Sequence, residues 1–126
     1  MNKISVNTSL APKPGGPYSQ GIVVGNLLFS AGFGPADPAT GAVADNVGDQ
    51  TRQVLRNITA VLAQRQATLD DVVKVTAHLQ NVVADFAAFN AAYGEFFHEP
   101  YPVRTTVGSD LQGILVEIDV VAVVNE

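Results

Sequence analysis

The feature that most constrains this 126-residue chain is its last apolar stretch, which reads Ile-Leu-Val-Glu-Ile-Asp-Val-Val-Ala-Val-Val over residues 114–124. Apolar residues occupy both alternating faces of this stretch, a pattern typical of a strand that is buried on both sides of its sheet. The stretch also contains Glu117. Because an unpaired carboxylate in an apolar interior costs free energy comparable to the stability margin of a small domain, we expect Glu117 to have a partner or a chemical task.

A candidate partner for this acid lies upstream, in the β-prone run of residues 101–107. This run contains Arg104, in a chain with only 7 lysines and arginines. A guanidinium is a planar fork that binds a carboxylate through two hydrogen bonds and stays charged at any working pH. Two interpretations follow from position alone: Arg104 forms a structural salt bridge, or it receives the carboxylate of a small ligand.

Composition excludes several classes of protein. The chain contains no cysteine, which excludes thiolate catalysis, zinc–thiolate sites and disulfides, and which is usual for a cytoplasmic protein. The net charge of -5 disfavours sequence-independent nucleic-acid binding, which requires a basic surface. No apolar run approaches the roughly 20 residues that span a membrane, and we recognise no signal peptide. We expect one domain, residues 1–126, in the cytoplasm.

The order of predicted elements is that of an α+β domain. A hairpin is expected around Gly25-Asn26, a pair suited to a two-residue turn. Apolar residues recur at helical spacing in two segments, the second with Asp85 as a plausible N-cap, and the remaining apolar segments alternate as strands. The predicted strands are residues 22–24, 27–29, 72–79, 103–107 and 114–124, and the predicted helices are residues 47–62 and 85–97.

These elements predict an assembly of several copies. Two helices can cover only one face of the sheet, whereas the final strand indicates burial on both faces. Since the chain has no further element for the second face, we expect another copy of the same chain to cover it. Clefts in such an assembly would be built from more than one subunit.

Several segments, in this order and at this spacing, resemble the reactive intermediate deaminase A (RidA/YjgF) family. The resemblance covers essentially the whole chain. It rests on the segments Gly16-Pro17-Tyr18-Ser19-Gln20-Gly21, Ala31-Gly32, Gln50-Thr51-Arg52-Gln53-Val54-Leu55-Arg56-Asn57-Ile58, Phe89-Asn90-Ala91-Ala92-Tyr93, Pro102-Val103-Arg104 and Val116-Glu117-Ile118.

The resemblance implies a chorismate-mutase-like fold, with a mixed sheet and two helices packed on one face, assembled as a homotrimer. It implies hydrolysis of reactive 2-imino or enamine acids to 2-keto acids and ammonia, in clefts between subunits and without a cofactor. Carried over to this sequence, it suggests catalytic roles for Glu117 and Tyr18. It suggests substrate binding by Arg104, Asn90, Gly32 and Thr106.

Each of these residues also has a structural interpretation. Glu117 can accept a proton from an attacking water or can be a partner of Arg104. Asp119 lies two residues on and therefore on the same face of the strand, but the resemblance points to Glu117. Tyr18, after a rigid Gly-Gly-Pro corner, can donate a hydrogen bond in a cleft or simply close the end of the sheet. Asn90 can bind substrate or tie helix to loop.

The chain departs from the family pattern at two places. Many members have Ser-Gly-Gln where this chain has Ala31-Gly32-Phe33, and a cysteine where it has Thr106. The second change matters less, because in the family it is mainly the backbone at that position that faces the ligand. The first change removes two hydrogen-bonding side chains and adds a ring, so we expect a pocket that is drier, smaller or tuned to another side chain.

The other charged residues favour structural interpretations. His78 and His98 have no ligand-spaced partners, so no metal site is expected. Arg52 and Arg56, one helical turn apart, are more typical of a solvated helix face than of a nucleic-acid patch.

Two other functions stay open beside deamination. One is a RidA-like protein that binds or senses a keto or amino acid without turnover, and the other is an endoribonuclease or translation inhibitor, a role attributed to some relatives.

Overall fold

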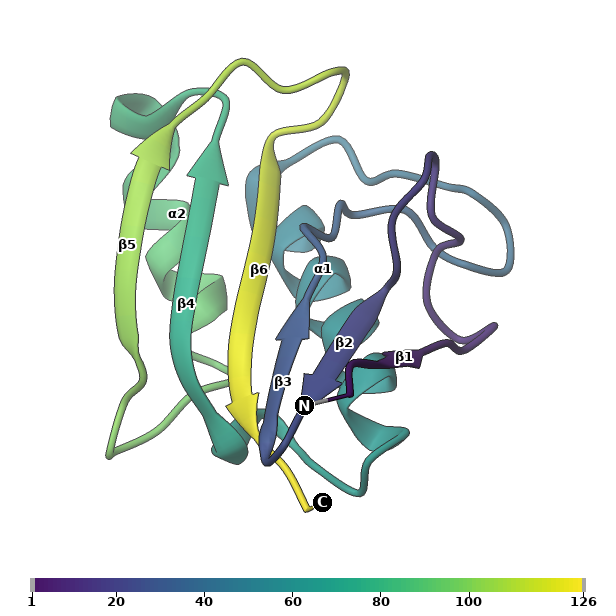
Figure 1. Cartoon of the computed structure of the whole chain (residues 1–126). Coiled ribbons are helices and arrows are strands. Elements are labelled where there is room, and N and C mark those ends of the chain that lie inside the picture. Colours follow the sequence, from purple (N-terminus) through teal and green to yellow (C-terminus); the bar gives the residue numbers. More distant parts are fainter. Residues whose placement is uncertain (1, 126) are drawn as a thin grey trace.

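The computed structural model describes residues 2–125 and contains one six-stranded mixed sheet with two α-helices on one side (Figure 1). The strand order is β1-β2-β3-β6-β4-β5. All neighbouring strands are antiparallel except β4 and β5, which are parallel. This arrangement confirms the predicted α+β class. The strands are β1 (Ile4–Val6), β2 (Gly21–Val24), β3 (Leu27–Ser30), β4 (Val72–Leu79), β5 (Val103–Gly108) and β6 (Val116–Val123).

Strands β2 and β3 form the predicted hairpin. Its turn contains Gly25 at φ 59°, a left-handed conformation that glycine adopts without steric cost. Two short elements were not predicted. Strand β1 has only three residues, and the 3₁₀-helix η1 (Leu69–Asp71) is a single turn. Neither is long enough to produce a recognisable period in the sequence.

Helix α1 spans Val47–Ala63 and confirms the predicted first helix. It begins at Asn46, whose side-chain oxygen accepts a hydrogen bond of 2.8 Å from the Asp49 N–H and so caps an unpaired backbone donor. Its apolar stripe packs on the sheet and contributes much of the core. Five of these side chains are completely buried: Val54, Leu55, Ile58, Val61 and Leu62.

Helix α2 spans Val82–Tyr93, so the predicted bounds of the second helix are wrong at both ends. The helix starts after Asn81, and Asp85 lies in its first turn instead of capping it. After Gly94 the chain continues in a tighter turn, in which the Phe96 N–H donates to the Tyr93 carbonyl over 3.0 Å. Apolar spacing continues through this turn, which is why the pattern placed the end of the helix too late.

Strand β6 lies near the middle of the sheet and explains the apolar final stretch. Its inward residues are buried under the helices: Val116, Ile118, Val120 and Ala122. Its other face, which carries Glu117 and Asp119, is only partly buried, and Val123 there is 42% exposed. Burial on both faces is therefore not complete in a single chain. The helices leave the second face of the sheet open, as the sequence predicted.

Two buried amides hold the loops that precede β2 and follow β3. The Asn57 side chain on α1 donates to the carbonyls of Gly34 and Ala36, over 3.1 and 2.9 Å. The Gln20 amide, 2% exposed, donates to the Pro12 carbonyl over 2.9 Å and anchors the Pro/Gly-rich segment that precedes it. Since buried polar groups are costly without partners, these bonds fix the paths of both loops.

Candidate functional site

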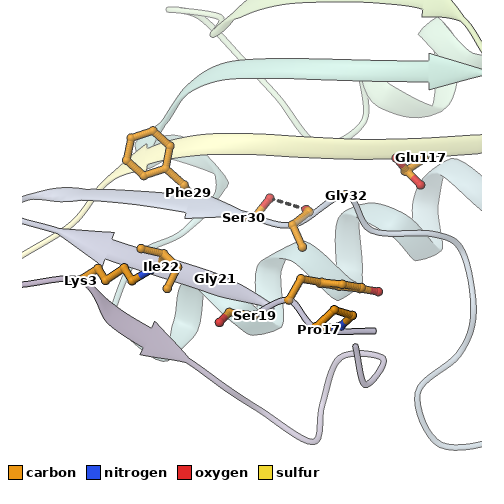
Figure 2. A pocket seen from close by; sticks show the side chains of 11 residues that line it. Lys3, Pro17, Ser19, Gly21, Ile22, Phe29, Ser30, Gly32 and Glu117 are labelled. Atoms are coloured by element: carbon orange, nitrogen blue, oxygen red, sulfur yellow. Dashed lines mark hydrogen bonds between the residues drawn. The ribbon is translucent and has the colours of Figure 1, made fainter. Parts of the chain in front are cut away.

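A cavity of about 700 Å³ lies where the Pro/Gly-rich segment, the end of β3 and the start of β6 meet (Figure 2). Three of the predicted site residues, Tyr18, Gly32 and Glu117, line this one cavity. They come from three separate parts of the sequence. The remaining lining residues are Lys3, Pro17, Ser19, Gly21, Ile22, Phe29, Ser30 and Ala31.

The backbone after β3 brings Gly32 against Glu117. Phe33 and Ile118 exchange two backbone hydrogen bonds, of 2.8 and 3.1 Å, which extend the β3–β6 pairing beyond the regular strands. This bridge turns Phe33 toward the core, and the neighbouring Gly32 lies close to the Glu117 carboxylate. Any side chain at position 32 would occupy the space that this carboxylate now fills.

The Glu117 carboxylate has a position suited to a proton acceptor. It is partly buried, borders the cavity and takes part in none of the ion pairs among residues 2–125, which involve Arg52 and His98. A carboxylate without a cationic partner keeps its oxygens available for a water or a ligand.

Asp119 lies on the same face as Glu117, as predicted, because the two acids are opposite Thr76 and His78 on β4. It does not line the cavity. Burial raises the pKa of Asp119, and the charges of His78 and Lys74 lower it in part. The position of Asp119 is therefore less suited than that of Glu117 to act on a molecule in the cavity.

Tyr18 lines the cavity and has 53% of its surface exposed. Its hydroxyl oxygen accepts a 2.9 Å hydrogen bond from the Gly15 N–H. A phenol that accepts in this way can still donate its own proton. Tyr18 therefore presents a positioned hydrogen-bond donor rather than only an apolar ring.

The structure places Arg104 on the opposite face of the sheet from Glu117. Arg104 is paired with Val75, whose β6 partner is the inward-facing Val120, whereas Glu117 is paired with the outward-facing His78. Since paired residues on neighbouring strands share a face, the two charges point away from each other. A salt bridge between Arg104 and Glu117 within one chain, one of the two interpretations of the sequence, is therefore wrong.

Asn90 and Thr106 accompany Arg104 on this other face. Asn90 is on α2, and Thr106 follows Arg104 by two residues on β5, an edge strand of the sheet. The Oδ1 of Asn90 and the Oγ1 of Thr106 are buried without a hydrogen-bond partner among the described residues. The open edge of β5 leaves backbone N–H and C=O groups near Thr106 free to bind, whereas its hydroxyl points under α2.

The expectation for Phe33 is wrong. Its ring is 4% exposed, belongs to the core and does not border the cavity, because the bridge to Ile118 turns it inward. Ala31 does line the cavity. The pocket at this point is therefore shaped by a small side chain and by the Gly32 backbone, and no additional ring enters it.

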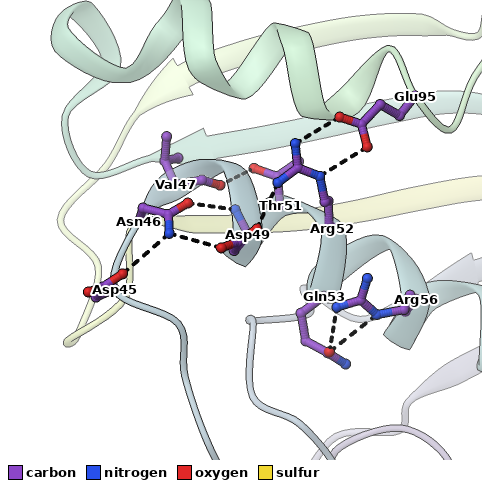
Figure 3. A network of polar contacts seen from close by, with 9 residues as sticks. All are labelled: Asp45, Asn46, Val47, Asp49, Thr51, Arg52, Gln53, Arg56 and Glu95. Carbon is purple, nitrogen blue, oxygen red and sulfur yellow. Dashed lines mark hydrogen bonds and ion pairs between the residues drawn. The ribbon is translucent and has the colours of Figure 1, made fainter.

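The two arginines of α1 are occupied within the chain (Figure 3). The Arg52 guanidinium lies 2.7 Å from Asp49 and 2.8 Å from Glu95, and Arg56 donates to Gln53 over 2.9 Å. The bridge to Glu95 connects α1 to the segment after α2. These contacts agree with the predicted solvated helix face. Two carboxylates balance the charge of Arg52, whereas Arg56 bonds to a neutral amide.

Within residues 2–125, no group of three or more His, Cys, Asp or Glu side chains is arranged to hold a metal ion. His98 forms an ion-pair contact of 2.7 Å with Asp70, and His78 shares a 2.7 Å hydrogen bond with Ser109. No helix in this part of the chain has the length and apolar character needed to cross a membrane.

The sequence model of the family described as Endoribonuclease L-PSP matches residues 8–124. A RutC family protein of Pyrococcus horikoshii is 47% identical over 118 residues, which cover 91% of this chain and 93% of that protein. The crystal structure of RidA from the Antarctic bacterium Psychrobacter has a TM-score of 0.91 at 32% identity and covers 96% of this chain and 99% of its own. The chain belongs to the RidA family.

Members of this family carry different functional names. The 2-iminobutanoate/2-iminopropanoate deaminase of Salmonella typhimurium is 36% identical over 124 residues, which cover 94% of this chain and 96% of that protein. The family description refers instead to an endoribonuclease. Membership therefore establishes the fold, and the choice among activities depends on the chemistry of the site.

Proposed function

We propose that this RidA-family protein hydrolyses reactive 2-imino and enamine acids to 2-keto acids and ammonia. The observation that carries the proposal is the unpaired Glu117 carboxylate, which faces a cavity beside the Gly32 backbone and the Tyr18 hydroxyl. The deaminase relative from Salmonella typhimurium supports the same chemistry.

We further propose that a complete site requires two copies of the chain. Glu117, Gly32 and Tyr18 border one cavity, whereas Arg104, Asn90 and Thr106 lie on the other face of the sheet. The open sheet face also carries exposed apolar residues, including Phe29 and Val123. Covering this face with another copy buries these residues and joins the two halves. The family suggests that the assembly is a homotrimer.

In the assembled cleft, Arg104 of one copy binds the carboxylate of the imino acid. Glu117 of the adjacent copy orients a water and accepts one of its protons as the oxygen attacks the imine carbon. Glu117 returns this proton to the imine nitrogen, which gives a carbinolamine. The proton of the carbinolamine hydroxyl then passes to the nitrogen through Glu117 as the C–N bond breaks, and ammonia leaves the 2-keto acid. Tyr18 and the backbone groups near Gly32 and Thr106 orient the imine region, and Asn90 shapes the pocket.

The direct test uses an imine made in place. A threonine dehydratase supplies 2-iminobutanoate, semicarbazide traps whatever imine remains, and the trapped product is followed with and without this protein. We expect the protein to accelerate the loss of imine to 2-ketobutyrate. No acceleration, together with measurable binding of 2-ketobutyrate, would favour the second candidate, a protein that binds a keto or amino acid without turnover.

The shared site has its own test, in which two impaired variants are mixed and assayed at a low substrate concentration. Subunits with Arg104→Lys and subunits with Glu117→Gln are unfolded, mixed and refolded, or are produced together. Each mixed trimer then contains one cleft with both residues intact, so about a quarter of the wild-type activity should return. Each variant refolded alone is the control. No recovery from verified mixed trimers would contradict a cleft that takes Arg104 and Glu117 from different copies.

The endoribonuclease role has weaker support. The chain carries a net charge of -5, and Arg52 and Arg56 are engaged by neighbouring side chains. Binding of the RNA backbone depends on free basic groups that release counterions. We therefore expect no cleavage of single-stranded RNA by the purified protein, under conditions in which imine hydrolysis is measured.

A further inference from the structure

Aromatic rings, rather than an acid, surround the guanidinium of Arg104. Its central carbon lies 4.7 Å from the ring centre of Tyr93, 5.3 Å from that of Phe89 and 5.9 Å from that of Phe86. Arg104 takes part in none of the ion pairs formed among residues 2–125. The charge is thus attracted to ring faces while no carboxylate of the same chain neutralises it.

The nearest ring belongs to a buried aromatic column. Tyr93 stacks on Phe97 at 4.4 Å and is tilted against Phe89 at 5.5 Å between ring centres. Phe89, Tyr93 and Phe97 are 0%, 7% and 4% exposed. Because this column is packed in the core, Tyr93 presents its ring to Arg104 in a fixed orientation.

The hydroxyl of Tyr93 is a second group of this residue that lies near Arg104. It is buried and makes no hydrogen bond of good geometry among the described residues. Burial raises the pKa of Tyr93, against the effect of the neighbouring Arg104, so the phenol stays neutral near pH 7. A buried polar group without a partner contributes no stability. The ring, by contrast, lies within cation–π distance of the guanidinium.

We propose that Tyr93 is a positioning residue whose ring fixes the orientation of the Arg104 guanidinium, so that its N–H fork is held ready for a carboxylate. This proposal rests on the proposed function in one respect: the carboxylate that Arg104 binds is that of the substrate. An acidic partner would also orient the arginine, but it would occupy the fork and compensate the charge. A ring face holds the group and leaves its N–H donors free.

The test compares Tyr93→Phe, which keeps the ring, with Tyr93→Leu, which removes it. Phe97→Leu is the matched control, because it removes a ring of the same column that does not contact Arg104. Three quantities are measured on the assembled protein: the KM and kcat for 2-iminobutanoate, the Kd for 2-ketobutyrate by calorimetry, and the ¹⁵N–¹H signal of the Arg104 Nε–H, assigned by its loss in Arg104→Lys.

We expect Tyr93→Leu to raise KM and Kd by about 3- to 30-fold, the equivalent of one cation–π contact, with a much smaller change in kcat. The Arg104 signal should lose its ring-current shift. Tyr93→Phe should keep both the signal and the affinity. Phe97→Leu should lower thermal stability while its KM stays near that of the wild type.

Other outcomes would overturn the proposal. An equal loss of affinity in Tyr93→Phe and Tyr93→Leu would assign the effect to the hydroxyl. An equal loss of affinity in Phe97→Leu would show that core packing alone explains it. The two proposals fail separately. A wild type that binds 2-ketobutyrate without turnover contradicts deamination, and Kd and the NMR signal still decide the role of Tyr93. A wild type that binds no 2-ketobutyrate refutes the carboxylate receptor itself.

Discussion

Gly32 and Glu117 are in such close contact that position 32 cannot carry a side chain without moving the acid. A Cβ atom built on Gly32 would lie 2.6 Å from Oε2 of Glu117 and 2.9 Å from its Cδ. Real Cβ atoms do not approach other heavy atoms so closely. The glycine is therefore needed for the position of the carboxylate and not for an unusual backbone conformation.

Gly32→Ala should consequently separate activity from folding. The new methyl group displaces the flexible end of Glu117, while the strands on either side remain paired. We expect turnover to fall by about 10- to 100-fold, since a displacement of about 1 Å in a catalytic group has effects of this size. Imine hydrolysis and thermal unfolding are measured on the same preparations.

The control for this substitution is Gly34→Ala. The nearest atom to a Cβ at Gly34 is Cδ1 of Ile114, at 3.3 Å, which can move without affecting Glu117. If Gly34→Ala and Gly32→Ala lost activity equally, general distortion of the loop would explain the result, and the contact with Glu117 would not.

Arg104→Lys tests recognition of the carboxylate. Lysine keeps the positive charge but loses the two-pronged fork and the contact of the guanidinium with the Tyr93 ring. We expect a large rise in KM with an assembled and folded protein, measured by steady-state kinetics and light scattering. Near-normal kinetics would show that a point charge is enough and that the fork has no special role.

The sequence pattern predicted the sheet, the hairpin and α1 because their apolar periods extend over whole elements. It placed the end of α2 too late because Phe96 and Phe97 keep helical spacing in the turn that follows Gly94. The apolar pattern reports which side chains are buried. It does not report which backbone hydrogen bonds are made.

The site was predicted only as a set of residues, since a sequence without a strand register does not say which face a residue occupies. One of the two interpretations of Arg104 paired it with Glu117, and the register of β4 with its two neighbours puts the two residues on opposite faces. Phe33 was placed in the pocket because the family pattern has a hydrogen-bonding side chain at that position, and the bridge to Ile118 instead turns its ring into the core. The supporting roles of Gln20 and Asn57 depend on contacts with distant loop carbonyls, for which the sequence contained no signal.

Asn57→Ala should destabilise the protein through the loop that leads away from Gly32. The substitution leaves the carbonyls of Gly34 and Ala36 without their donor, at a cost of about 1–3 kcal/mol in the free energy of unfolding. Urea denaturation at fixed protein concentration measures the change. Thr59→Ala is the control, because that exposed hydroxyl bonds only to the Leu55 carbonyl of its own helix. Equal effects in the two variants would contradict a role of Asn57 in holding the loop.

Stability in acid should depend on the bridge between Arg52 and Glu95. The Arg52 guanidinium lowers the pKa of Glu95 below its ordinary value of 4.5, and hydrogen bonds from Asn46 and Arg52 lower the pKa of Asp49 below 3.8. A carboxyl with a lowered pKa stabilises the folded state above its ordinary pKa. This contribution is lost as the pH falls through the pKa of the folded state.

Glu95→Gln should therefore flatten the decline in the free energy of unfolding below about pH 4.5 and leave a slightly less stable protein at pH 7. Both carboxyls are exposed, so the change should shrink in high salt. Denaturant titrations at several pH values give the slope of the unfolding free energy against pH for the wild type and for the variant. An unchanged slope in the variant would show that the bridge contributes nothing to stability in solution.

Glu117→Gln separates the enzyme from the binding protein. Glutamine keeps the shape of the side chain, so the cavity and the contact with Gly32 should remain, but the amide cannot accept the proton that an attacking water gives up. We expect the kcat for 2-iminobutanoate to fall by about 100-fold or more and the Kd for 2-ketobutyrate, measured by calorimetry, to change little. Asp119→Asn is the matched control, because it removes an acid from the same face that does not border the cavity. If Asp119→Asn slowed turnover and Glu117→Gln did not, the acid that acts on water would be Asp119, and the proposed arrangement around Gly32 would be wrong.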